Sequence, residues 1–205
     1  MLTLYYGPRT CALASLIALE ESGLEHRVER LDMAAGAQKS DAYLKINPKG
    51  RVPALATERG ILTETPAILV YIAHNASKIR LAPVEDAFEF ARMQAFNSYL
   101  CSTVHVAHAH GRRASRWTDD KAAMETMKAK VSQNMADCMA LIEAEMFVGP
   151  WVLGERYSVA DPYFFTIAGW MKSDGVDPEQ FPRIAEHRAR MLERPAVQRA
   201  IVHEN

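Results

Sequence analysis

The sequence carries almost no net charge and no long hydrophobic run, and both absences argue against whole classes of function. Its 24 lysines and arginines balance 25 aspartates and glutamates, which leaves a net charge of −1. Such a chain has no basic excess for nucleic acid or an anionic membrane, so we expect neither as a partner. No apolar stretch approaches the roughly 20 residues that span a bilayer, and no basic leader precedes the first apolar segment. We therefore expect a cytoplasmic protein.

Cysteine is also scarce. Cys11, Cys101 and Cys138 are odd in number and widely spaced, which indicates neither a disulfide framework nor a CxxC site. The rest of the composition, with 49% hydrophobic and 24% charged residues, is that of an ordinary globular protein. A length of 205 residues allows one domain or two small ones.

The opening stretch of the chain is where we expect chemistry. Leu2–Tyr6 predicts a strand, Gly7-Pro8 ends it, and Thr10 is a suitable N-cap for the apolar helix that follows. Cys11 then lies in the first helical turn, where free N–H groups and the helix dipole favour a thiolate or a bound anion. Lowering a thiol pKa from ~8.5 to roughly 6.5 requires about 2.7 kcal/mol, but a helix terminus supplies only ~0.3–1 kcal/mol. Other donors or a bound substrate must contribute, and a plain cysteine packed at a strand–helix junction is the alternative.

The first 80 residues alternate strands and helices. After the first strand and helix, the pattern predicts a strand, a short helix, a hairpin with its turn at Gly60, and a helix capped by Thr65 with Pro66 in its first turn. This βαβαββα order can bury a mixed four-stranded sheet. The predicted segments after the first helix are His26–Leu31, Asp41–Ile46, the hairpin over 52–63, and the helix from Thr65.

Beyond a linker at 81–85, residues 86–205 contain no strand pattern and predict an all-helical domain. Methionines recur at helical spacing between Met124 and Met146, a stripe that favours core packing over a cofactor site. Ser158–Asp161 has the spacing of a capping box ahead of an apolar run. The helices are expected over Glu85–Arg113, Thr118–Met146, a run from Ser158, Pro182–Glu193 and Pro195–Val202.

Several of these motifs resemble those of cytosolic glutathione transferases. Asn47–Leu55 (NPKGRVPAL) and Thr63–Ile68 (TETPAI) are similar to the NPxGxVPxL and (T)ES-x-AI signatures of that family. Tyr5–Ala14 resembles the opening of the bacterial beta class, in which a cysteine holds the position of Cys11. Ser158–Asp161 resembles the capping box of the helical domain. The resemblance covers nearly the whole chain and implies a thioredoxin-like α/β domain, an all-α domain, a homodimer and glutathione as co-substrate.

The resemblance also implies a glutathione site. Val52, before an expected cis Pro53, would pair its backbone with the cysteinyl part of glutathione. Glu64 would pair with the γ-glutamyl ammonium, while the Thr65 hydroxyl and nearby N–H groups would receive the α-carboxylate. Without the resemblance, Pro53 is equally well an ordinary strand-edge proline, and Thr65 simply caps its own helix. The family usually has serine at the position of Thr65.

Other positions are less settled by sequence. The beta class often presents a lysine after the second strand, but the loop here has none at that place, and Lys39 or Arg51 are the candidates to replace it. His105 matches a beta-class histidine that faces the cysteine, and it shares a helix face with Cys101 and His108. An active-site histidine, a core or interface histidine and, least favoured, a metal ligand remain open for it.

The leading hypothesis is a glutathione transferase that conjugates hydrophobic electrophiles in detoxification, without a metal. Cys11 and His105 are the predicted catalytic residues. A hydroxyl from Tyr5, Tyr6 or Thr10 is the alternative activator of the thiol. Thiol–disulfide exchange or deglutathionylation through Cys11 is the second hypothesis, and a non-catalytic glutathione-binding protein of the same fold is the third. The predicted binding residues are Tyr5, Thr10, Arg51, Val52, Pro53, Glu64 and Thr65.

Overall fold

The first part of the chain folds around a mixed four-stranded sheet. The structure is a computed structural model that describes residues 1–76 and 79–205, so the predicted domain 1–80 includes two positions outside the described residues. The strand order is β2-β1-β3-β4, with β1 and β2 parallel and the other neighbours antiparallel. The predicted sheet is therefore confirmed. The strands are β1 Leu2–Tyr6, β2 His26–Arg30, β3 Ala54–Thr57 and β4 Gly60–Thr63.

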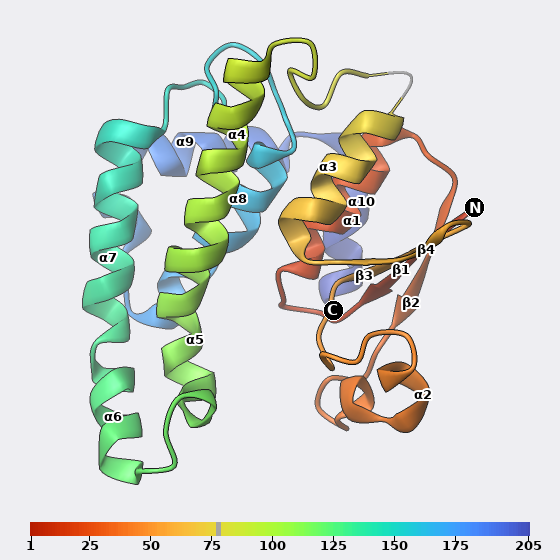
Figure 1. The fold of residues 1–205 in the computed structure, drawn as a ribbon. Helices are drawn as coiled ribbons and strands as arrows, with labels where there is room; N and C mark the ends of the chain where they lie inside the picture. Colours follow the sequence, from red (N-terminus) through yellow and green to blue (C-terminus); the bar gives the residue numbers. More distant parts are fainter. Residues whose placement is uncertain (77–78) are drawn as a thin grey trace.

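Three helices complete this domain. The helices α1 (Ala12–Ser22) and α3 (Thr65–Asn75) cover one face of the sheet, and the short α2 (Asp41–Leu44) lies on the other side (Figure 1). The first of them, α1, is buried nearly all round because α3 packs on one side and helices from the end of the chain pack on the other. It ends at Gly23, whose φ of 67° is one that glycine adopts without strain.

The rest of the described chain is helical, as predicted. No helix in the described ranges is long and apolar enough to cross a bilayer. The four-stranded sheet domain followed by a helical part confirms the predicted fold class, a thioredoxin-like domain followed by an all-helical domain. Its helices are α4 Ala87–Tyr99, α5 His105–Arg113, α6 Lys121–Ala129, α7 Val131–Leu141, α8 Ala160–Ala168, α9 Pro182–Leu192 and α10 Pro195–Ile201.

The single helix expected over Glu85–Arg113 contains a π-helical turn. Leu100–Val104 forms this turn between α4 and α5. A π turn holds an extra residue, so it rotates every side chain that follows and is frequent at functional sites. His105 is the first residue after it, and the turn therefore sets the direction in which α5 presents its side chains.

The methionine stripe is only partly core. The predicted helix over Thr118–Met146 is interrupted at Lys130, where α6 ends and α7 begins. Met135, on α7, is fully buried, whereas Met124 and Met127 on α6 are only partly buried. The methionines on α6 are less buried because α6 extends past the body of the domain, beyond the reach of α8 and α9 (Figure 1).

The capping box at the start of α8 is present. The Asp161 carboxylate accepts from the Ser158 backbone N–H (2.7 Å), and the Ser158 hydroxyl accepts from the Ala160 N–H (3.2 Å). Asp161 also accepts from the Val152 N–H (2.8 Å) and makes a 3.0 Å hydrogen bond with His187 Nε2. Asp161 is fully buried, so one carboxylate ties three segments of the helical domain together.

The C-terminal helix returns to the first domain. Helix α10 packs along α1, and two ion pairs, Arg194–Glu21 and Arg199–Glu20, support the contact. Just beyond α10, the Glu204 carboxylate accepts from the Arg9 backbone N–H and from the Tyr6 hydroxyl. The end of the chain thus holds the loop that precedes Cys11.

Candidate functional site

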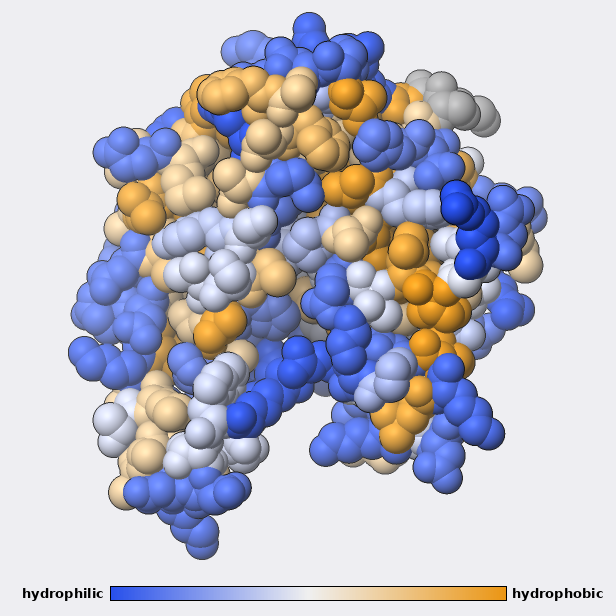
Figure 2. Space-filling view, in the orientation of Figure 1, coloured by the Kyte–Doolittle hydropathy of each residue, from blue (hydrophilic) through white to orange (hydrophobic). Residues whose placement is uncertain are grey.

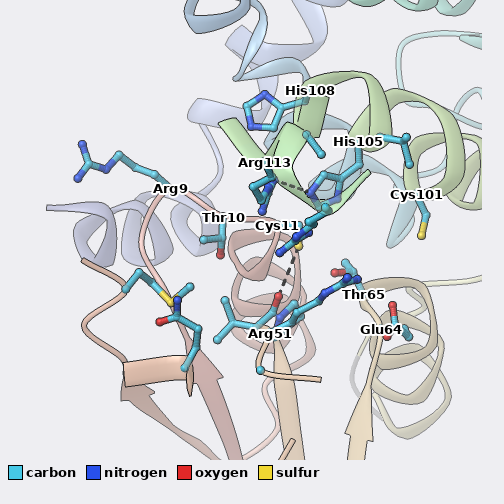
Figure 3. A pocket seen from close by; sticks show the side chains of 18 of the residues that line it. Arg9, Thr10, Cys11, Arg51, Glu64, Thr65, Cys101, His105, His108 and Arg113 are labelled. Carbon is cyan, nitrogen blue, oxygen red and sulfur yellow. Dashed lines mark hydrogen bonds between the residues drawn. The ribbon is translucent and has the colours of Figure 1, made fainter. Parts of the chain in front are cut away.

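A cavity of about 460 Å³ lies between the two domains. Figure 2 shows the surface hollowed where the two lobes meet, with strongly hydrophilic side chains at its edge. In the close view, His105 and Arg113 reach from α5 toward Cys11, while Arg51, Glu64 and Thr65 come from the thioredoxin-like domain (Figure 3). All but one of the predicted site residues line this cavity: Thr10, Cys11, Arg51, Val52, Pro53, Glu64, Thr65 and His105.

Cys11 lies at the start of α1, one residue earlier than predicted. It is the N-cap residue, and the Thr10 hydroxyl accepts from the Ala12 N–H (3.2 Å), so Thr10 still satisfies one free donor. Cys11 is only 9% exposed, and its thiol donates to the Val52 carbonyl at 3.7 Å.

The helix terminus alone does not activate Cys11, as the comparison of free energies indicated. Burial raises the pKa of its thiol, and the Thr65 hydroxyl and the Arg113 charge act in the opposite direction without reversing it. Desolvation of a thiolate outweighs the small contribution of a helix terminus. The unliganded protein therefore holds Cys11 as a neutral thiol that donates a hydrogen bond.

The loop before β3 presents its backbone to the cavity. The Val52–Pro53 peptide bond is cis, as the resemblance implies. The Arg51 carbonyl accepts from the Tyr43 hydroxyl (2.8 Å) and from Asn47 Nδ2 (2.7 Å), which fixes the loop from behind. The asparagine of the NPKG motif therefore has a mechanical role, because it anchors the segment that carries Val52.

The start of α3 differs from the prediction in one detail. The N-cap is Glu64, with a φ of 71°, and Thr65 is the first helical residue rather than the cap. Backbone at positive φ costs free energy for a residue other than glycine and is frequent at ligand-binding sites. The Glu64 carboxylate pairs with Lys49, whose ammonium also donates to the Thr63 hydroxyl (2.7 Å). Thr65 is buried at the cavity wall.

His105 is an uncharged member of the site. Burial, together with the nearby Arg113 charge, lowers the pKa of His105 to about 3. Its Nε2 accepts from Arg113 Nη2 at 3.3 Å, and its ring packs edge-on against Trp170 with centroids 4.9 Å apart. At neutral pH this histidine therefore brings no positive charge to the cavity. Its hydrogen bond instead positions the Arg113 guanidinium.

Cys101 and His108 line the same cavity, as their shared helix face with His105 suggested. His108 is held by a 2.8 Å contact with Asp174 and stacks on Trp170. Within residues 1–76 and 79–205, no group of three or more histidine, cysteine or acidic side chains is arranged to hold a metal ion.

Tyr5 does not line the cavity, contrary to the prediction. Side chains alternate along β1, so Tyr5 faces away from the buried Leu4 and Tyr6 and packs against Tyr43 with ring centroids 5.7 Å apart. The Tyr6 hydroxyl is held by Glu204. Neither tyrosine therefore presents its hydroxyl to a thiol beside Cys11, and the Thr10 hydroxyl donates to the Gly7 carbonyl (2.7 Å).

Sequence reasoning missed Arg113 as a central residue of the site, because it considered this arginine only as the end of the helix expected over Glu85–Arg113. Arg113 is partly buried, contacts His105, and has a buried Nε with no hydrogen-bond partner among the described residues. Its charge also acts on the Cys11 thiol. The signal was present in the sequence, since His105 follows Cys101 by four residues and Arg113 follows His105 by eight, so each lies near the same helix face as the one before it.

A thioredoxin-like domain joined to an all-helical domain, with a cavity between the two, defines the class of fold, and comparison with known families identifies the family within it. The family model described as "Glutathione S-transferase, N-terminal domain" matches residues 1–74, and the one described as "Glutathione S-transferase, C-terminal domain" matches residues 88–195. The chain therefore belongs to the glutathione S-transferase family.

Individual relatives agree along nearly the full length. Glutathione S-transferase GstA of Escherichia coli O157:H7 is 32% identical, over 98% of both chains. A solved glutathione transferase homolog from Sulfitobacter, with bound glutathione, is 45% identical, with a TM-score of 0.94 over 97% of this chain and 96% of that one. A solved bacterial beta class glutathione S-transferase from Sphingomonas chungbukensis is 31% identical, with a TM-score of 0.86 over 99% and 98% of the chains. The resemblance to bacterial glutathione transferases is confirmed.

Proposed function

We propose that this transferase joins the thiolate of glutathione to hydrophobic electrophiles in the interdomain cavity. One observation carries the proposal: Val52, Thr65, Cys11 and Arg113 all line the same cavity. The first two suit a peptide-like ligand, and the other two suit its sulfur. The glutathione bound in the solved Sulfitobacter homolog supports the choice of ligand.

Glutathione is proposed to lie along the thioredoxin-like domain. Its cysteinyl backbone pairs with Val52, and its α-carboxylate meets Thr65 and the free N–H groups at the start of α3. Its ammonium pairs with Glu64, which exchanges some of its contact with Lys49 for the ligand. Lys39 and Arg51, which both line the cavity, are the proposed partners of the glycyl carboxylate.

The sulfur of glutathione then lies beside Cys11. Because Cys11 is a neutral hydrogen-bond donor in the unliganded protein, its thiol can donate to a thiolate, and Arg113 supplies a positive charge. The thiol proton leaves to solvent, and the sulfur attacks the electrophile with its electron pair. Positioning and charge stabilisation together carry the rate enhancement. His105 acts by orienting Arg113.

Thiol–disulfide exchange through Cys11 is the second candidate. The feature that favours it is the position of the Cys11 sulfur on the cavity wall beside the Val52 carbonyl. The feature that disfavours it is the raised pKa of this thiol, since the thiolate is the attacking form. A binding protein without turnover is the third candidate, and the following experiment separates all three.

Incubation with oxidised glutathione, followed by intact-mass measurement, is expected to add one glutathionyl group to the wild-type chain and none to Cys11→Ser. In this reaction the Cys11 sulfur attacks one disulfide sulfur and releases the other half as glutathione thiolate. Cys101→Ser is the matched control, because Cys101 lines the same cavity, and it should keep the adduct.

A conjugation assay on the same variants assigns the function. Cys11→Ala is expected to abolish exchange but to lower conjugation only modestly, and equal loss of both would contradict this separation of roles. Conjugation without an adduct would indicate that a residue other than Cys11 activates the thiol of glutathione. Saturable glutathione binding with neither reaction would support the binding protein.

We further propose that the chain works in the cytoplasm as a homodimer. Support comes from Phe88 at the start of α4, a large apolar side chain that is 72% exposed. Light scattering at micromolar concentration is expected to give twice the chain mass, and a monomer there would contradict the proposal.

A further inference from the structure

The cavity holds more positive charge than glutathione can neutralise. Within the described residues, the only carboxylate on its wall is Glu64, which is already paired with Lys49. None of the cationic side chains on the wall forms an ion pair with a carboxylate in residues 1–76 and 79–205. Those cationic side chains are Arg9, Lys39, Arg51, Arg113 and Arg116.

Three of these guanidinium groups act on one another. Burial lowers the pKa of Arg116, and the charges of Arg113 and Arg51 lower it further. Burial likewise lowers the pKa of Arg113, and the positive charge of Arg51 lowers it as well. Arg51 belongs to the thioredoxin-like domain, while the other two come from α5 and the turn after it. The repulsion therefore runs across the cavity, and a ligand with several negative charges would relieve it.

Glutathione accounts for part of this charge. Bound as a thiolate, it carries two carboxylates, one thiolate and one ammonium. The proposed partners above assign Lys39 and Arg51 to the glycyl carboxylate and Arg113 to the thiolate. Arg9 extends away from Cys11 in Figure 3. Arg116, on the helical side of the cavity, has no group of glutathione left to meet.

Aromatic surfaces accompany Arg116. Its neighbour Trp117 lines the cavity, is 45% exposed and packs against His110 with ring centroids 4.4 Å apart. Trp170 lines the cavity as well. Flat aromatic side chains and a guanidinium group in the lining of one cavity suit a ligand that has a planar apolar body and a negative group.

We propose that the electrophile is an anionic aromatic compound whose carboxylate binds Arg116. This inference rests on the proposed conjugation and names the class of its second substrate. For an aryl halide, the thiolate sulfur forms a bond to the ring carbon, and the carbon–halogen bond then breaks. The halide leaves with the bonding pair, so atoms and electrons balance without any further reactant.

A matched pair of probes tests the charge preference. 4-Chloro-3,5-dinitrobenzoate is anionic, and 4-chloro-3,5-dinitrobenzamide is its neutral counterpart of nearly the same shape. After division by each uncatalysed rate, kcat/KM for the acid is expected to exceed that for the amide. Arg116→Gln should lower this acid-to-amide ratio about tenfold, the effect of losing one charged hydrogen bond. Arg112→Gln removes the same charge from an exposed neighbour outside the cavity and should leave the ratio unchanged.

A ratio that is insensitive to Arg116→Gln, or equally sensitive to Arg112→Gln, would overturn the inference. A binding measurement separates it from the proposed function. Quenching of tryptophan fluorescence by unreactive 3,5-dinitrobenzoate and 3,5-dinitrobenzamide reports occupancy, because two tryptophans line the cavity. One outcome is that the protein conjugates neither chlorinated probe and still binds 3,5-dinitrobenzoate more tightly than 3,5-dinitrobenzamide, in a manner that depends on Arg116. In that case the proposed conjugation is wrong, but the anion site at Arg116 is supported. Equal binding of the two would remove the anion site.

Discussion

Replacing Asp161 with alanine is expected to lower the free energy of unfolding by about 3–5 kcal/mol, which would be a large fraction of the stability of a typical domain. The Asp161 carboxylate is fully buried and accepts from Val152 N, Ser158 N and His187 Nε2. Its removal leaves these buried donors without an acceptor, and each unsatisfied group costs free energy that the alanine cannot recover. Denaturation in urea, followed by circular dichroism, measures the loss.

The control for this experiment is Asp137→Ala. Asp137 is exposed on α7 and, among the residues that the structure describes, accepts a hydrogen bond only from Gln133, so its loss should change the free energy of unfolding by less than about 0.5 kcal/mol. Asp161→Asn, which keeps an acceptor oxygen, should fall between the two. A loss below about 1 kcal/mol for Asp161→Ala would contradict the role of this carboxylate as the tie among three segments.

Replacing Arg113 with methionine is expected to lower kcat/KM for glutathione conjugation about 100-fold, or about 3 kcal/mol of transition-state stabilisation. Methionine keeps much of the apolar stem but removes the positive charge that acts on the Cys11 thiol region. The pKa of bound glutathione, followed by thiolate absorbance against pH, should rise in the variant. Because His105 is neutral above about pH 4, its own titration should not shape the activity profile near neutrality.

Three comparisons make the result for Arg113 specific. Arg112→Met, at an exposed neighbouring position, should retain wild-type kcat/KM. Arg113→Lys should recover part of the activity, since it restores charge but not the fork that reaches His105. Thermal unfolding checks that each variant is folded. A folded Arg113→Met with unchanged kcat/KM and an unchanged thiol pKa would contradict the assignment.

The parts of the fold that could be predicted from sequence are those set by local chemistry. The strand pattern of β1, the stop at Gly23 and the capping box at Ser158–Asp161 all follow from residue type and spacing. The π-helical turn at Leu100–Val104 could not be predicted, because no residue type signals it and packing around it decides the local twist.

In the candidate site, too, sequence motifs identify some residues, whereas other properties depend on how the chain packs. The motifs around Val52 and Thr65 led to residues that line the cavity, because short backbone signals carry that information. Tyr5 was wrongly predicted to bind the ligand. Because side chains alternate along β1, the Tyr5 side chain lies on the face opposite to Leu4 and Tyr6, where it packs against Tyr43. The raised pKa of Cys11 depends on burial by both domains, and the proximity of Arg113 depends on how the domains pack. Neither can be found in one segment of sequence.

The return of α10 to the first domain limits how the chain can be divided. Residues 195–204 are the last part of the helical domain in sequence, yet they cover α1 of the first domain and hold the loop before Cys11 through Glu204. A fragment cut at the linker would lose this cover and expose apolar surface of α1 to water. We therefore expect the two domains to unfold as one cooperative unit, in which the segment after α10 supports the loop that precedes Cys11.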